Sequence, residues 1–219
     1  MRTIVIAIAV CLLAAGTSWA QKNVTDPFGV KAPDRIDCIT DGYDCFCGGD
    51  GGDIPDADPA GVVFGPAAST DGGPVIVDVI LFVEMTHTWI GDLQMFLYYD
   101  FDCDGDLDVM GQILERPGVP GTTFGCSGDL NGLYGFDDTV GSIEDACPST
   151  FPAGCYGPDY DSVGMDVFDG LPIGGCFWLR VVDNAGGDTG AVLGWEVCVM
   201  SRITPVEESS WGHVKALYR

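Results

Sequence analysis

The stretch from Pro74 to Leu97 constrains the fold of this chain more than any other. In its first half, side chains alternate so that one face is wholly apolar and the other is mixed. The apolar face is formed by Val75, Val77, Val79, Leu81, Val83 and Met85, and the mixed face by Ile76, Asp78, Ile80, Phe82 and Glu84. This period of two, in β-branched and aromatic residues, predicts a long strand. A fully apolar strand face must be covered by a second sheet, so the pattern predicts a β-sandwich.

Other strands follow from the same kind of pattern. A polar bend at residues 86–92 leads into the apolar run Leu93–Tyr99, which predicts a second strand. Further short strands are predicted at Val62–Phe64, Val109–Leu114, Cys176–Val182 and Ala191–Met200, with a short strand or turn at Val163–Phe168. No helical period of useful length is found. Short strands separated by glycine and proline predict an all-β jelly-roll β-sandwich over residues 54–202.

The two ends of the chain differ from this central region. Residues 1–20 combine Arg2, a short apolar run and small residues before Gln21, which predicts a cleaved signal peptide. No later apolar run is long enough to cross a bilayer, so we expect a secreted, periplasmic or cell-surface protein without a membrane span. Residues 21–53 form a Cys/Gly/Asp-rich leader. In residues 203–219, the acidic pair Glu207 and Glu208 gives way to a basic, aromatic end, and this tail is either a frayed terminus or a sorting or docking tag.

The formal net charge of −24 excludes whole classes of partner. Such a chain does not bind nucleic acid or an anionic membrane through its charge. It suits calcium, a basic partner, or simple solubility.

Nine cysteines follow the expected signal peptide, and in an exported chain they predict disulfides and not metal thiolates. Pairing by proximity in the sequence gives Cys147 with Cys155, Cys176 with Cys198, and Cys103 with Cys126. The group Cys38, Cys45 and Cys47 has one member too many. An odd total leaves a free thiol or a bond to another chain.

Several segments, taken together and in order, resemble the P domain (P/Homo B domain) of the proprotein convertases. They are IPDADPAG (54–61), THTWIGDLQMFL (86–97), RPGVPGTTFGCSGD (116–129), FDD (136–138), FDGL (168–171) and WLRVVDNAGGDTGAVLGWEV (178–197). The resemblance implies a jelly-roll sandwich of the galactose-binding-like kind. In convertases and many bacterial subtilisin-like proteases this domain follows and stabilises the catalytic domain, with calcium in some members.

The chain departs from those proteases in lacking a visible catalytic domain. A subtilisin-like enzyme needs Asp, His and Ser in a domain of their own. The two histidines are His87, in the polar bend where we expect a structural role, and His213 in the tail. No serine lies in a nucleophile elbow. We therefore expect a non-catalytic protein, with serine-type endopeptidase activity belonging to the proteins that usually carry this domain.

The strongest candidate site is a ladder of aspartates after the second predicted strand. Asp100, Asp102 and Asp104 match positions 1, 3 and 5 of an EF-hand-like loop, and Gly105 matches position 6. Asp106 and Asp108 stand at positions 7 and 9. Position 12 would be Gly111 in place of the bidentate glutamate, and Glu115 or a main-chain carbonyl could complete the cage. The ladder predicts a calcium site, and the alternative is an acidic, solvated hairpin tip.

A second candidate calcium site is the segment DNAGGDTG, with Asp183, Asn184 and Asp188 as ligands. Its glycines permit tight backbone turns that point oxygens inward. An equally good alternative is a turn whose Asp and Asn side chains cap their own backbone. Asp92, Asp137, Asp138 and Asp169 are expected at turns or strand ends.

Two functional hypotheses follow. The first is a calcium-stabilised accessory or interaction module that attaches to a protease or another protein in trans. The second is an extracellular carbohydrate-binding or adhesion module, with Trp89 as a sugar platform. Trp178 and Trp195 are expected in the core or on a sheet face.

Overall fold

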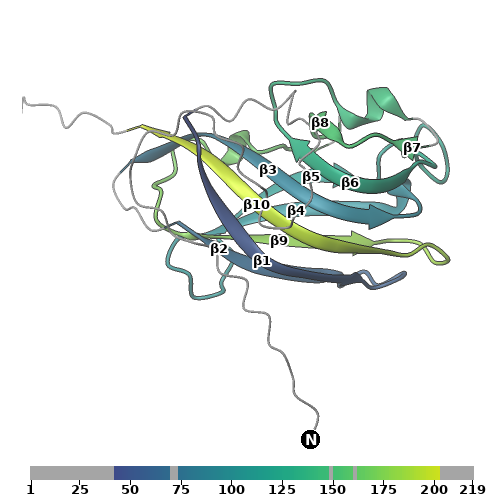
Figure 1. Cartoon of the computed structure of the whole chain (residues 1–219), viewed down its shortest axis with the longest axis horizontal. Helices are drawn as coiled ribbons and strands as arrows, with labels where there is room; N and C mark the ends of the chain where they lie inside the picture. The colour runs from purple at the N-terminus through teal and green to yellow at the C-terminus, as the bar shows by residue number, and fades with distance from the viewer. Residues whose placement is uncertain (1–41, 70–73, 148–149, 160–161, 203–219) are drawn as a thin grey trace, which may run out of the picture.

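The computed structural model describes residues 42–69, 74–147, 150–159 and 162–202, and these form an all-β sandwich of two sheets (Figure 1). The expected signal peptide, most of the expected leader and the tail at residues 203–219 lie outside them. One sheet has the order β1-β10-β3-β6-β7, with β8 also paired to β6, and the other has the order β2-β9-β4-β5. We call them sheet A and sheet B. No helix within the described ranges is long and apolar enough to span a membrane.

The elements have the following bounds. Sheet A contains β1 (Asp44–Ile54), β3 (Val75–His87), β6 (Asp129–Phe136), β7 (Thr150–Phe151), β8 (Gly154–Tyr156) and β10 (Gly190–Arg202). Sheet B contains β2 (Val62–Ala68), β4 (Leu93–Asp100), β5 (Val109–Glu115) and β9 (Cys176–Asp183). Short 3-10 helices are η1 (Ile90–Asp92), η2 (Ile143–Ala146) and η3 (Asp166–Phe168). The segment expected as a short strand or turn at Val163–Phe168 therefore ends in a 3-10 helix.

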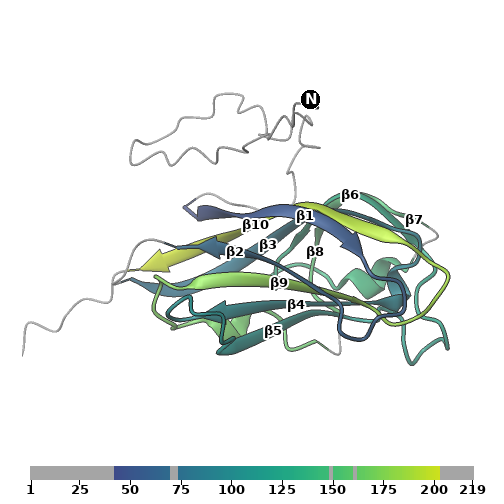
Figure 2. The same cartoon turned by 90° about the horizontal axis from the view of Figure 1, so that it is seen from below.

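Strand β3 is the centre of sheet A and has the predicted faces from Val79 onward, whereas at its start Ile76 lies in the core and Val75 and Val77 are only half-buried, against the prediction. It lies between β10 and β6, and both pairings are antiparallel. Val79, Leu81, Val83 and Met85 are buried in the core between the sheets. Ile80 and Phe82, on the other face, join Cys198 in a second, smaller cluster on the outside of sheet A. The sandwich layers are seen edge-on in Figure 2.

Four strands were not predicted: β1, β6, β7 and β8. Strand β1 lies within the expected leader and pairs antiparallel with β10, so the sheet begins at Asp44 and not near Ile54. Its sequence, DCFCGGDGGDI, is rich in residues that are depleted in strands, which hid it from pattern analysis. Gly48 has a packing role there, because a Cβ at this position would overlap the indole ring of Trp195.

All three disulfides predicted from proximity in the sequence are wrong. The bonds join Cys45 to Cys198, Cys103 to Cys176, and Cys126 to Cys147. Two of them span 153 and 73 residues, because the sandwich places strands side by side that are remote in the sequence. Every cysteine in the described ranges is disulfide-bonded, so the expected free thiol is not among them. Cys38 lies outside those ranges.

Candidate metal centre

The loop between β4 and β5 brings three of the five ladder aspartates together. One carboxylate oxygen from each of Asp100, Asp102 and Asp104 lies within 4.8 Å of the other two. Asp106 and Asp108 do not join this group. The Asp106 N–H donates to Asp104 Oδ1 (2.8 Å), and Asp108 Oδ2 accepts the Phe101 N–H (2.9 Å). We call the three converging side chains the Asp triad.

Asp100 is the buried member of the Asp triad. Its side chain accepts the N–H groups of Gly105 (2.8 Å) and Asp102 (3.3 Å), so the chain curls around it. Burial acts to raise the pKa of Asp100, but the surrounding backbone N–H donors outweigh it, and the pKa is lowered. The carboxylate is therefore ionised at neutral pH although it is fully buried.

The exposed members of the triad repel one another. The negative charge of Asp104 is the main cause that raises the pKa of Asp102, followed by desolvation and the charge of Asp100. Such a shift measures the cost of holding like charges close together. A divalent cation among the three carboxylates would remove that cost.

A disulfide and two residues in the left-handed backbone conformation fix the shape of this loop. Cys103, inside the loop, is bonded to Cys176, the first residue of β9. Cys103 and Gly105 have φ angles of 59° and 92°. These conformations turn the chain sharply enough for alternate residues to point inward.

The donor set fits calcium in kind and supplies part of its coordination. Calcium takes six to eight hard oxygens, and three carboxylates supply some of them. The expectation that Glu115 completes the site is wrong. It pairs with Gln94 at the opposite end of the β4–β5 hairpin, and its Oε1 accepts the Gln94 amide N–H (3.0 Å). Gly111 also lies within the hairpin, opposite Leu97, so the loop ends earlier than an EF-hand loop.

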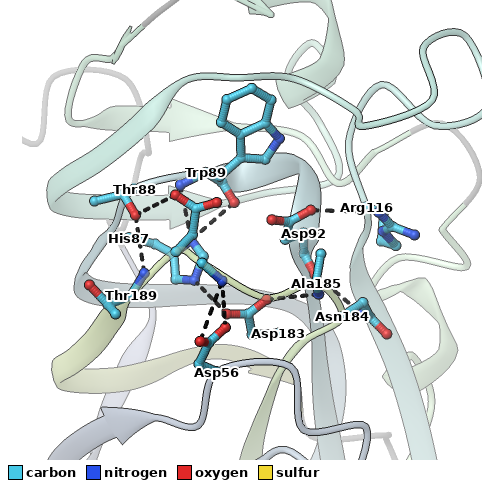
Figure 3. A network of polar contacts seen from close by, with 12 residues as sticks. Asp56, His87, Thr88, Trp89, Asp92, Arg116, Asp183, Asn184, Ala185 and Thr189 are labelled. Carbon is cyan, nitrogen blue, oxygen red and sulfur yellow. Dashed lines mark hydrogen bonds and ion pairs between the residues drawn. The ribbon is translucent and has the colours of Figure 1, made fainter.

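The second candidate set does not converge. Asp183 is buried and accepts the Ala185 N–H (3.1 Å), Asn184 donates its amide N–H to the Asp92 carbonyl (3.0 Å), and Asp188 accepts the Thr88 hydroxyl (2.8 Å). Figure 3 shows the contacts of Asp183 and Asn184. They are the contacts of a turn that caps its own backbone and holds neighbouring loops.

His87 organises this network at the end of the sandwich opposite the Asp triad. Its Nε2 lies 3.3 Å from Asp183 Oδ2, and its Nδ1 lies 3.1 Å from the Trp89 N–H (Figure 3). Nδ1 also lies 3.0 Å from the Trp89 carbonyl oxygen, so the ring contacts both polar groups of the Trp89 backbone as well as Asp183. Both ring nitrogens are engaged, as the expected structural role requires.

Sequence analysis missed the partners that surround this histidine. Asp92 is buried, and its Oδ1 lies 3.6 Å from Arg116 Nη2. Burial is the main cause that raises the pKa of Asp92, and the charge of Asp183 adds to it. Asp56, from the β1–β2 connection, accepts the Gly187 N–H (3.1 Å). No period or motif in the sequence pairs these positions, because they meet only after the sandwich has formed.

Comparison with known proteins assigns the chain to no family. No protein-family model matches the chain, and no curated protein matches it. Among solved structures, it is similar to a chain in the crystal structure of the Aeromonas sobria serine protease (ASP) and chaperone (ORF2) complex. The TM-score is 0.40 and the identity 16%, over 74% of this chain and 26% of that one. The chain thus spans about a quarter of the length of that protein, and a likeness this distant carries no information on activity.

Proposed function

We propose that this protein is an exported, non-catalytic sandwich module that binds calcium through the Asp triad and serves as an accessory or interaction module for another protein. A secreted protease is the first partner to test, given the sequence resemblance to the P domain. The observation that carries the proposal is the convergence of Asp100, Asp102 and Asp104, one buried and ionised, in a loop held by a disulfide. Calcium bound there would join β4, β5 and β9 at one end of sheet B.

The position of His87 supports a non-catalytic role. A general base must reach a proton on the substrate, directly or through one water. His87 is the one histidine in the described ranges, and it is buried with both ring nitrogens engaged. It therefore holds the β3–β4 bend against the β9–β10 loop and does not face a substrate.

Thermal unfolding of the intact chain tests the calcium site. A ligand that binds only the native state, at a hundred times its Kd, adds about 2.7 kcal/mol. For a domain of this size we expect the midpoint to rise by several degrees in calcium relative to chelator. Magnesium should give a smaller shift, because it demands a tighter octahedral site. An unchanged midpoint in saturating calcium contradicts the metal site, and hydrolysis of casein by the purified chain contradicts the non-catalytic role.

The carbohydrate alternative gains no support from the structure. Trp89, its expected platform, is half-buried, and its indole N–H donates to the Phe124 carbonyl (2.7 Å). Glycan binding remains a prediction from the sequence, and we propose no second function.

A further inference from the structure

The outer face of sheet B carries apolar and aromatic side chains in two neighbouring rows. Trp178, Tyr98 and Met110 lie side by side across strands β9, β4 and β5. Val63, Arg180 and Phe96 form the next row, with the Arg180 guanidinium 5.5 Å from the centre of the Phe96 ring. Met110 is 44% exposed and Val63 49% exposed. An exposed apolar area of this kind marks a surface that a partner covers.

One end of this face is strongly acidic. Phe101, which is 41% exposed, leads from Asp100 into the β4–β5 loop. The loop then presents four exposed carboxylates, those of Asp102, Asp104, Asp106 and Asp108. A segment that covers the apolar rows and reaches this loop must therefore combine apolar and cationic side chains.

The chain carries such a segment after its last strand. The whole sequence has only nine lysines and arginines, yet Lys215 and Arg219 stand close together in the tail at residues 203–219. The same tail holds the large apolar residues Trp211, Leu217 and Tyr218. Glu207 and Glu208 stand nearer the start of the tail, so the part that complements the acidic, apolar surface on sheet B is residues 209–219.

The tail also starts at the correct end of the sandwich. Arg202, the last residue of β10, pairs with Val75, which forms a bridge to Pro172. The Pro172 carbonyl accepts the hydroxyl of Tyr99 (2.6 Å), the neighbour of Asp100. The arrowheads of β10 and β4 accordingly point to the same end in Figure 2. An extended chain spans about 3.3 Å per residue, so the ten residues from 203 to 212 alone reach about 30 Å.

We propose that the tail, residues 203–219, docks on the outer face of sheet B of its own chain, with Lys215 and Arg219 beside Asp106 and Asp108, the exposed aspartates of the β4–β5 loop that lie outside the Asp triad. The tail covers Met110 and Phe101 in this arrangement, and salt weakens the contact because its polar part is electrostatic. The docking goes beyond the calcium proposal and needs no metal.

Oxidative footprinting of the full chain in chelator tests the docking without involving calcium. Labelling of Met110 and Phe101 should rise several-fold in the Lys215→Glu/Arg219→Glu double variant and in a chain that lacks residues 203–219. The Lys22→Glu/Lys31→Glu double variant makes the same change in net charge near the other terminus and should label like wild type. Phe124, which is 67% exposed at the opposite end, serves as an internal reference.

Each outcome decides the question. Labelling of Met110 and Phe101 that is equal in wild type, charge variant and truncated chain overturns the proposal. Protection that grows with protein concentration assigns the tail to a second copy and overturns docking within one chain. Protection that is independent of concentration, lost in both variants and reduced by salt supports it.

Discussion

His87 and Asp183 are 96 residues apart in the sequence, and their fully buried side chains meet with 3.3 Å between Nε2 and Oδ2. The contact joins the end of β3 in sheet A to the end of β9 in sheet B. It is therefore a polar contact between the two sheets at the end of β3, a strand whose residues Val79, Leu81, Val83 and Met85 belong to the apolar core. A polar pair of this kind fixes how the two sheets align at this end.

Replacing His87 by alanine should lower the free energy of unfolding by about 3–5 kcal/mol, because Asp183 would stay buried without its partner. Urea unfolding measures the change. His213→Ala, in the tail, is the matched control and should have no effect. In a double-mutant cycle, His87→Ala and Asp183→Ala should together cost less than the sum of the single variants. Additive losses would contradict the pairing.

Asp138 should make stability depend on pH. Burial is the main cause that raises its pKa to about 6, and the charges of Asp166 and Asp78 add to it, against the Met165 N–H that it accepts. The folded state thus keeps a proton that the unfolded state loses. The stabilisation is complete below about pH 4 and is lost as the pH rises through about 6. For a half-buried side chain we expect a loss of about 1–2 kcal/mol after allowance for solvent screening.

The Asp138→Asn variant tests this pH dependence. It keeps an acceptor for the Met165 N–H and removes the charge, so its stability should be flatter than that of wild type between pH 4 and 7. Asp129→Asn, at an exposed carboxylate on the first residue of β6, should follow wild type. Parallel curves for wild type and Asp138→Asn, from urea unfolding at each pH, would show that another group titrates.

Calcium binding should distinguish carboxylates within one loop. Asp102→Asn and Asp104→Asn should each shrink the calcium-dependent rise in the unfolding midpoint, because each removes a charged ligand. Asp106→Asn removes the same charge from the same loop but lies outside the Asp triad, so it should keep most of the rise. Equal losses in all three variants would indicate general electrostatic attraction in place of a defined site.

The disulfide at the Asp triad should support both stability and metal binding. Loss of Cys103–Cys176, which spans 73 residues, should cost about 4 kcal/mol by the chain-entropy estimate. Loss of Cys126–Cys147, which spans 21 residues, should cost about 3 kcal/mol. The double Cys→Ala variants that remove each disulfide should therefore differ little in stability. The calcium-dependent rise in the unfolding midpoint should fall only in the variant without Cys103–Cys176. A calcium shift that survives without Cys103–Cys176 would show that the loop holds its shape unaided.

The sequence predicted those parts of the fold that depend on local pattern. The alternation along β3 identified its two faces from Val79 onward, and β2, β4, β5, β9 and β10 followed from short apolar runs between turns. Strand β1 was missed because it is rich in glycine, which has low strand propensity, although Gly48 leaves room there for the indole ring of Trp195. Strands β6, β7 and β8 were missed as well. The disulfides were mispaired because distance along the chain does not measure distance across a sandwich.

The candidate site was also predictable from the sequence only in part. The alternation of aspartates with a following glycine indicated the loop, and the structure brings together the three residues at positions 1, 3 and 5. The length of the hairpin, which places Glu115 at its far end, depends on strand register and was not readable from the spacing. The contacts of His87 with Asp183 and of Asp92 with Arg116 were equally hidden, because each joins residues that are far apart in the sequence.

The pairing of β1 with β10 has a mechanical consequence. Asp44 lies opposite Val199, and Cys45 opposite its disulfide partner Cys198, so both flanking sequences leave the sandwich at one corner. Tension applied through those sequences would peel β1 away from that corner, one backbone hydrogen bond after another. The covalent bond at the second pair stops the peeling almost at once. Under oxidising conditions the disulfide therefore keeps β1 paired with β10 at this corner. After reduction, this corner is where the domain first unfolds under tension.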